Sequence, residues 1–397
     1  MLSTKKFKTK TEFVPRNNGH IPGTWELAID IGYSAVKLFS PNIIARFPSY
    51  AMKVENDFNY MSDAPANSIL VRDLNLNELW LVGEQAQYQI DTRNSLDSEN
   101  TLYGRDRYTS PMFSIIVKAS LAIGMLDNEF GTYNNEPIVI QSGLPELYMS
   151  DKDILIDVLA KPHRFEIKIG NDEWKSFDIK IEKENIYLMS QPKGSLLSVC
   201  IDKDGSWHPE AKKYMNSSVL VFDPGFGTLD LFPIRSGVVG HGETFADLGM
   251  KRILQETANK IKQEYNVTIQ VAAMQPCLET GTVRVGNVKL FESSDEPIGE
   301  FLVEASHKVF EDAIERMVNS VNIMDYDYMI ITGGTGAAWK HYIQEKFKKL
   351  STLQLLYANQ NDSLPFVYSN VRGYYLYRFN MLGKEQAKNY QQQKAYA

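Results

Sequence analysis

Cysteine is scarce in this sequence, and long apolar runs are absent. The chain has 397 residues and two cysteines, Cys200 and Cys277, which have no C-x-x-C spacing. They indicate neither a disulfide framework nor a zinc site, and we expect buried or partly buried thiols in a reducing compartment. No window approaches the roughly 18 apolar residues of a membrane span, and no apolar segment follows the charged amino terminus. The sequence therefore predicts neither a membrane span nor a secretion signal.

An excess of basic residues is also missing. The net charge is −7, so the overall electrostatic field does not favour binding to nucleic acid, and we expect no direct DNA binding. The composition, with 43% hydrophobic and 23% charged residues, is ordinary for a soluble globular protein. The length allows a sizeable core, divided between two lobes. We expect a cytoplasmic protein without a membrane partner.

Three stretches stand out because each carries an apolar β-type run into a turn rich in glycine and hydroxyl residues. They are residues 27–37 (LAIDIGYSAVK), 219–231 (VLVFDPGFGTLDL) and 328–339 (YMIITGGTGAAW). In the first two, an acidic residue ends the strand and a glycine follows two positions later, as Asp30 with Gly32 and Asp223 with Gly225. Each motif alone is equally typical of an ordinary turn with a capping aspartate. Their order and wide spacing in the sequence favour a nucleotide-binding site that the three turns form together.

The chemistry of a magnesium–polyphosphate ion explains these residue types. Glycine turns bring backbone N–H groups close to phosphate. Asp30 and Asp223 are predicted to hold magnesium through its bound water, Ser34 and Thr228 add hydroxyl donors, and Lys37 adds a positive charge. In the third stretch the glycines open a predicted helix over residues 337–349 and leave room for the flat adenosine. The residues predicted to bind the nucleotide are Asp30, Gly32, Tyr33, Ser34, Lys37, Gly225, Phe226, Gly227, Thr228, Gly333, Gly334 and Thr335.

These motifs resemble the phosphate-1, phosphate-2 and adenosine motifs of the actin/Hsp70/sugar-kinase ATPase superfamily. Within it, the sequence is most similar to bacterial plasmid-segregation actins of the ParM type, since DPGFGTLD resembles their D-x-G-x-x-T-x-D form. Further matches are FPS at residues 47–49, IVIQSGLP at 138–145, LMSQPKG at 188–194, ADLGM at 246–250 and NVRGYYL at 370–376. The resemblance covers about residues 25 to 380. Tyr33 and Pro224 depart from the family pattern.

The resemblance implies an α/β, actin-like fold of two lobes, each built on a mixed β-sheet flanked by helices, with the nucleotide in the cleft between them. Lobe I is predicted over residues 25–222 with an inserted subdomain at about 48–107, and lobe II over residues 223–365. Residues 366–397 are predicted to return to lobe I and end in a polar tail. The basic leader, residues 1–24, is longer than in the family and is predicted to be a flexible extension; a filament contact or added residues are the alternatives.

Hydrolysis of ATP needs a side chain that orients the attacking water. The resemblance assigns this role to Gln191, where ParM proteins have a glutamate and actins a glutamine. An amide has no useful proton-accepting pKa, so Gln191 would position the water without acting as a base, and Asp223 would share the work beside the metal. Without the resemblance, Gln191 is only a turn residue before Pro192.

The predicted function is a magnesium-dependent ATPase that polymerises head to tail and segregates plasmid or other extrachromosomal DNA, through a DNA-bound adaptor protein at the filament end. ATP is only weakly favoured over GTP as the cofactor. A small-molecule kinase or phosphatase of the same superfamily is the alternative, although no sugar-kinase substrate motif is visible. A chaperone-like module is disfavoured, because about 50 residues follow the adenosine helix and leave no room for a substrate domain.

Overall fold

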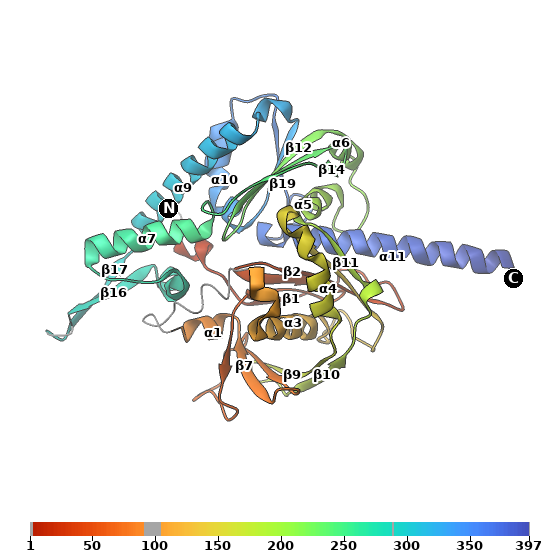
Figure 1. Ribbon diagram of the computed structural model, residues 1–397, viewed down its shortest axis with the longest axis horizontal. Helices are drawn as coiled ribbons and strands as arrows, with labels where there is room; N and C mark the ends of the chain where they lie inside the picture. Colours follow the sequence, from red (N-terminus) through yellow and green to blue (C-terminus); the bar gives the residue numbers. More distant parts are fainter. Residues whose placement is uncertain (1–2, 91–104, 288–289, 397) are drawn as a thin grey trace.

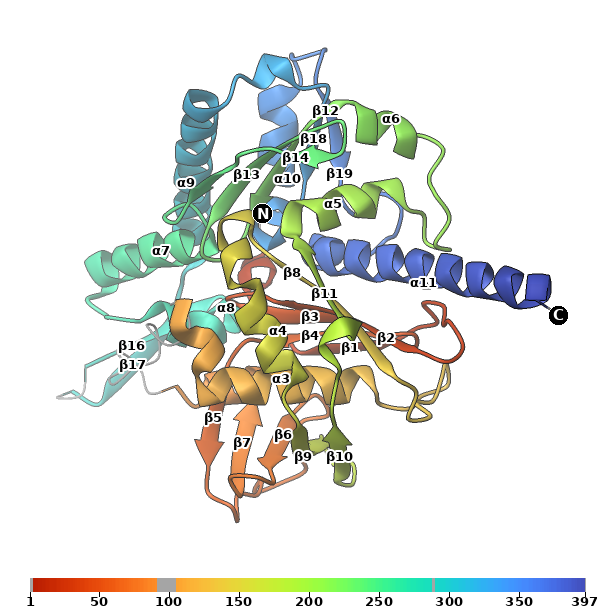
Figure 2. The ribbon, with the colours of Figure 1, turned by 45° about the vertical axis from the view of Figure 1, so that its right-hand side comes forward.

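The computed structural model describes residues 3–90, 105–287 and 290–396. The chain forms two lobes, one above the other in Figure 1, with the first half of the sequence in the lower lobe and the second half in the upper lobe. The long helix α11 (Ser369–Tyr396) runs along the boundary between the lobes. In Figure 2 the carboxyl-terminal end of α11 projects beyond both.

The lower lobe, lobe I, is built on a mixed sheet in the order β1-β4-β3-β2-β8-β11. Its strands are β1 (Glu12–Pro15), β2 (Trp25–Ile31), β3 (Ala35–Phe39), β4 (Ile43–Pro48), β8 (Ile138–Leu144) and β11 (Ile186–Ser190). All of β2 is buried, because successive side chains of a strand point to opposite faces and both faces are covered. Leu27 and Ile29 share a core with helix α3 (Pro111–Gly124), and Ala28 shares one with α11.

A second, antiparallel sheet extends lobe I, in the order β10-β9-β6-β7-β5. It consists of β5 (Ala51–Val54), β6 (Ile69–Asp73), β7 (Glu78–Val82), β9 (His163–Ile169) and β10 (Lys175–Ile179), with α1 (Glu84–Tyr88) after β7 and α4 (Lys152–Ala160) before β9. The insertion predicted at residues 48–107 supplies only part of this sheet. The β9–β10 hairpin, which lies outside this insertion, completes the sheet because β9 pairs with β6.

The upper lobe, lobe II, has a mixed sheet in the order β14-β13-β12-β18-β19, with β15 also paired to β13. Its strands are β12 (Ser218–Pro224), β13 (Leu229–Arg235), β14 (Val238–Val239), β15 (Glu243–Phe245), β18 (Tyr328–Ile331) and β19 (Gln354–Tyr357). The helices are α6 (Ala211–Asn216), α7 (Met250–Tyr265), α8 (Gln275–Thr280), α9 (Gly299–Ser320) and α10 (Gly334–Phe347). A hairpin of β16 (Thr282–Asn287) and β17 (Glu292–Pro297) projects from this lobe (Figure 1).

One apolar core belongs to both lobes. It joins lobe I residues such as Phe39 to lobe II residues such as Val221, through helices α5 (Gln191–Cys200) and α11. The two helices cross at glycines: a Cβ on Gly373 would lie only 1.9 Å from the carbonyl oxygen of Gly194. Since α5 follows the last strand of the lobe I sheet and leads towards lobe II, this crossing fixes how the lobes face each other.

The chain ends differ from the sequence-based expectation. The leader, predicted as a flexible extension, forms a short 3-10 helix (Thr4–Phe7) and strand β1, which pairs with β4. The carboxyl-terminal residues, predicted as a polar tail, continue helix α11. Neither pattern was visible in the hydrophobic periodicity, because β1 is short and the end of α11 is exposed and polar.

Two expectations from composition can be compared with the structure. Cys200 is buried and Cys277 half-buried, as predicted, and both are free thiols. Among the described residues, no helix combines the length and the apolar character needed to cross a membrane.

The helix crossing gives a stability prediction with a matched control in the same helix. Gly373→Ala places a methyl group against backbone of α5, so we expect a loss of about 1–3 kcal/mol in unfolding free energy from overpacking. Gly383→Ala meets only the Ile21 side chain at 3.7 Å and should leave stability unchanged or raise it by about 0.5–1 kcal/mol. Urea unfolding of both variants measures this difference, and equal stability would contradict the account of the crossing.

Candidate functional site

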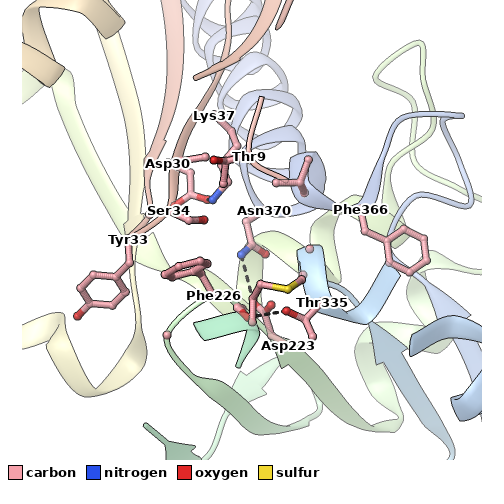
Figure 3. Close-up of a pocket in the computed structure, with 18 of the residues that line it drawn as sticks. Thr9, Asp30, Tyr33, Ser34, Lys37, Asp223, Phe226, Thr335, Phe366 and Asn370 are labelled. Carbon is pink, nitrogen blue, oxygen red and sulfur yellow. Dashed lines mark hydrogen bonds and ion pairs between the residues drawn. The ribbon is translucent and has the colours of Figure 1, made fainter. Parts of the chain in front are cut away.

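A cavity of about 400 Å³ lies between the lobes. It is lined by the turn after β2, the turn after β12, the start of α10 and the first residues of α5 and α11, so both lobes contribute. All the residues predicted to bind nucleotide or act on it line this one cavity. Figure 3 labels several of them, among them Asp30, Lys37 and Asp223. Its size is in the range of small-ligand and cofactor sites.

The first wall of the cavity is the turn between β2 and β3. Asp30 is 3% exposed and lies opposite Lys37 in the register of the two strands. The Lys37 ammonium donates to Oδ2 of Asp30 at 3.2 Å. Ser34 lies in the same turn, whereas the Tyr33 ring points away from Asp223 in Figure 3. The Arg107 guanidinium lies 4.5 Å from the centre of that ring, and burial raises the pKa of the Tyr33 phenol.

Gln191 reaches the same aspartate from another element. It is the first residue of α5, directly after β11, and Pro192 at the second position suits a helix start. Its amide Nε2 donates to Oδ1 of Asp30 at 3.2 Å. Asp30 thus accepts from Lys37 on one oxygen and from Gln191 on the other. This bond uses the amide nitrogen, so the amide oxygen of Gln191 is the atom that can accept a hydrogen bond from a water molecule.

The second wall is the turn between β12 and β13, where two carboxylates lie close together. Asp223 and Asp230 are directly opposite each other in the antiparallel pair. Asp230 is 7% exposed and accepts from the hydroxyls of Thr228 at 2.7 Å and Thr244 at 2.6 Å. Burial raises the pKa of Asp223 to about 7, and repulsion from Asp230 and Asp30 adds to the rise. Burial also raises the pKa of Asp230.

The third wall, at the start of α10, is joined to the second. Gly333 has φ of +76°, and a Cβ there would lie 2.5 Å from Oδ1 of Asp223, so this position needs glycine. The Thr335 hydroxyl donates to the carbonyl oxygen of Gly225 at 2.7 Å. These contacts fix the adenosine-type motif against the phosphate-2-type turn.

The two turns face each other across the cavity. A Cβ on Gly227 of lobe II would lie 3.6 Å from the ring of Tyr33 in lobe I. Helix α7 supports the second turn from behind, because the backbone N–H groups of Met250 and Lys251 donate to the carbonyl oxygens of Gly225 and Phe226. This explains the ADLGM match in the sequence, whose last residue begins α7.

Several residues at the site lie outside the set predicted from the sequence. Asn370 of α11 donates through Nδ2 to Oδ2 of Asp223 at 3.4 Å, and it begins the NVRGYYL match that had no assigned role. Asp230 ends the DPGFGTLD match and could have been assigned from it. Arg107 and leader residues such as Lys8 also line the cavity, and no motif in the sequence signalled either.

Side chains alone would not bind a magnesium ion in this cavity; water and phosphate would supply the other ligands. Among the residues described, no group of three or more His, Cys, Asp or Glu side chains is arranged to hold a metal. The carboxylates of Asp30 and Asp223 nevertheless fit an ion held through water and phosphate, because oxygen is the ligand magnesium prefers. The raised pKa of Asp223 points the same way, since its crowded negative charge favours a nearby cation.

The fold is similar to that of several known proteins. Residues 28–194 match the family model described as "Actin like proteins N terminal domain". The whole chain is similar in structure to a non-polymerisable quadruple mutant of pCBH ParM, with TM-score 0.68 and 20% identity over 90% of this chain and 99% of that one. The chain has an actin-like fold, which it shares with ParM. The α/β architecture expected from the sequence is thus confirmed.

Other solved structures show the same fold. A 15-stranded ParM filament from Clostridium botulinum gives a TM-score of 0.66 at 19% identity, covering 89% of this chain and 99% of that one. The actin-like protein Alp7A gives 0.63 at 14% identity, covering 94% and 100%. No curated protein sequence matches the chain.

The crowded carboxylates give a pH prediction for the nucleotide-free protein. The folded-state pKa of Asp223 is about 7, above the ordinary 3.8, so the folded state binds more protons than the unfolded state between these values. Its contribution to stability is therefore present at low pH and is lost as the pH rises through about 7. Asp223→Asn, which cannot ionise, should raise Tm at pH 8 by about 2 °C or more.

The same variant should show a smaller fall in Tm between about pH 6 and pH 8 than the wild type, as measured by thermal melts in nucleotide-free buffer. Asp57→Asn, which changes an exposed carboxylate, is the control and should retain the wild-type slope. An unchanged slope in Asp223→Asn would show that Asp223 is ionised throughout this range.

Proposed function

We propose that this actin-like protein is a magnesium-dependent ATPase that polymerises and moves plasmid or other extrachromosomal DNA in the cytoplasm. The observation that carries the proposal is the convergence of both lobes on one cavity, with Asp30, Lys37 and Gln191 on one side and Asp223 and Thr228 on the other. A ligand that both lobes bind favours one angle between the lobes, so a chemical change in the ligand can change that angle.

The residues have distinct roles in the proposed reaction. Lys37 and the hydroxyls of Ser34 and Thr228 bind the phosphates, and the backbone N–H groups of the glycine turns add donors. The amide oxygen of Gln191 orients the attacking water, since Asp30 holds the amide nitrogen at 3.2 Å. An amide has no useful proton-accepting pKa, so Gln191 positions the water without accepting its proton.

Magnesium would be held near Asp30 and Asp223 through water, and when bound it neutralises the charge that develops on the phosphates. Asn370 and Gly333 keep Asp223 in place, because one donates to its Oδ2 and the other allows the close approach of the adenosine-type motif. ATP is preferred over GTP only weakly, since Ala337 and Ala338, which line the cavity in the first turns of α10, would contact a base by packing.

The proposed function includes assembly into a filament and binding of an adaptor protein. One of the similar structures is a ParM filament and another is a ParM mutant described as non-polymerisable. Head-to-tail contacts between copies of one chain generate an open filament. With a net charge of −7, this chain would act on DNA through a DNA-bound adaptor protein at the filament end.

The test pairs two readouts on one sample of purified protein: light scattering for polymer and phosphate release for hydrolysis. Magnesium-ATP should produce scattering above a critical protein concentration, with filaments visible by negative-stain microscopy and scattering that decays as phosphate is released. Scattering that stays flat at tens of micromolar protein, with ATP, GTP and their slowly hydrolysed analogues, would contradict polymerisation and favour the kinase-like alternative.

Two variants separate assembly from hydrolysis in the same assay. Gln191→Ala and Asp223→Ala should slow phosphate release about 10²-fold or more, because each removes one positioned group. Assembly should change less, since triphosphate binding uses the glycine turns and Lys37. Their filaments should outlast those of the wild type. Disassembly at the wild-type rate, or undiminished hydrolysis, would show that the assigned residue has another role.

A further inference from the structure

The amino-terminal leader crosses from one lobe to the other at the edge of the cavity. Phe7 is 3% exposed and belongs to the apolar core of lobe II. Four residues later, Thr11 is held by lobe I: its backbone N–H donates to Oε2 of Glu84 at 3.1 Å, and its hydroxyl accepts from the Glu84 N–H at 3.4 Å. Residues 7–11, which we call the strap, therefore span the lobes (Figures 1 and 2).

Lys8 is the second residue of the strap and contacts both lobes through one ammonium group. It donates to Glu84 and to the Tyr88 hydroxyl at 2.8 Å, both on α1 of lobe I, and to Oε2 of Glu279 on α8 of lobe II at 3.0 Å. The Lys8 side chain is 5% exposed. Burial opposes its charge, but the bonds to Glu84, Tyr88 and Glu279 outweigh burial and raise the pKa of Lys8.

Thr9 makes a second bridge beside the first. Its backbone N–H donates to Oε1 of Gln275 on α8 at 3.0 Å. Its hydroxyl lies 3.2 Å from that oxygen and 3.2 Å from Oε1 of Gln87 on α1, so it can donate to either lobe. Gln275 is itself 3% exposed. The strap thus fills the gap between α1 and α8 with polar contacts to both.

The strap is also part of the cavity wall. Phe7, Lys8 and Thr9 line the same cavity as Asp30 and Asp223. We propose that the strap holds the two lobes together over the nucleotide cavity and slows nucleotide release. This inference rests on the proposed nucleotide-binding function and adds an element that controls exchange.

Separation of α1 from α8 would break bonds that the strap makes to both. Lys8 is the residue whose loss breaks the bridge most directly, since its ammonium serves both lobes. When one partner of a buried, hydrogen-bonded charge pair is removed, the effect appears mainly in the dissociation rate. Lys8→Met keeps the length and apolar stem of the side chain but removes the charge and donors. We expect it to accelerate nucleotide release about 10-fold.

The experiment measures release of a fluorescent ATP analogue from protein held below its critical concentration, with excess ATP added as the chase. Lys5→Met is the matched control: Lys5 also lines the cavity and donates to the same Glu279 at 2.7 Å, but among the described contacts it has no bond to α1 of lobe I, and it is 58% exposed. It removes the same charge near the cleft, and we expect a release rate within about 2-fold of the wild type.

Two further variants separate the strap from a folding defect. Glu279→Gln alters a partly exposed residue, keeps the bond between Lys8 and Glu84, and should accelerate release by a smaller factor than Lys8→Met. Lys8→Arg restores a cation with several donors and should return release towards the wild-type rate. Thermal melts identify any variant that fails to fold.

The outcomes distinguish the two proposals. If the wild type fails to bind the analogue, the proposed nucleotide-binding function fails. If the wild type binds and folded Lys8→Met releases the analogue at the wild-type rate, the strap proposal alone fails. An equal acceleration by Lys5→Met and Lys8→Met would also overturn it, because a general loss of positive charge would then explain the effect. Faster association in Lys8→Met without faster release would show that the strap obstructs the cavity and does not retain its ligand.

Discussion

The close crossing of α5 and α11 is the contact on which the rest of the structure depends. These helices form a core shared by both lobes, and they touch where Gly194 and Gly373 have no side chains. The same helices bring polar side chains to the cavity at their first turns: Gln191 begins α5 and Asn370 lies at the start of α11. This packing contact thus sets the separation of the lobes. It also brings Gln191 within hydrogen-bond distance of Asp30, and Asn370 within hydrogen-bond distance of Asp223.

Buried carboxylates give this cavity its character. Burial raises the pKa of Asp223 to about 7, and repulsion from the nearby Asp230 and Asp30 adds to the rise. Neutral donors such as Thr228, Thr244 and Asn370 satisfy the carboxylate oxygens without cancelling their charge. Perturbed carboxylates in a cleft are a recognised sign of a functional site, and a site that concentrates negative charge suits a cation that a polyphosphate brings with it.

The sequence predicted those parts whose signal is local. The apolar β-type runs of residues 27–37, 219–231 and 328–339 correspond to strands β2, β12 and β18, since each run is short and ends in a glycine turn. The turn residues were found because glycine, aspartate and threonine are required at fixed spacing. What the sequence did not reveal depends on tertiary pairing: β9 and β10 join a sheet formed mostly by earlier residues, and β12 begins before the predicted lobe boundary at residue 223.

The leader is the clearest case of information that the sequence does not carry. Its lysines are typical of a solvated tail, and nothing in the local pattern distinguishes Lys8, which is buried between lobes, from Lys10, which is exposed. Only the position of Glu84 and Glu279, at two distant points of the chain, gives Lys8 its role. The sequence pattern also did not predict the exposed end of α11, because a helix that extends into solvent needs no apolar stripe.

The central claim is that both lobes hold one nucleotide between the facing turns. Hydrogen exchange, compared with and without magnesium and a slowly hydrolysed ATP analogue, tests it most directly. The account predicts slower exchange on binding in both turns, residues 32–37 of lobe I and residues 225–228 of lobe II, at the same ligand concentration. Protection confined to one lobe, or absent from both turns while the analogue is bound, would contradict it.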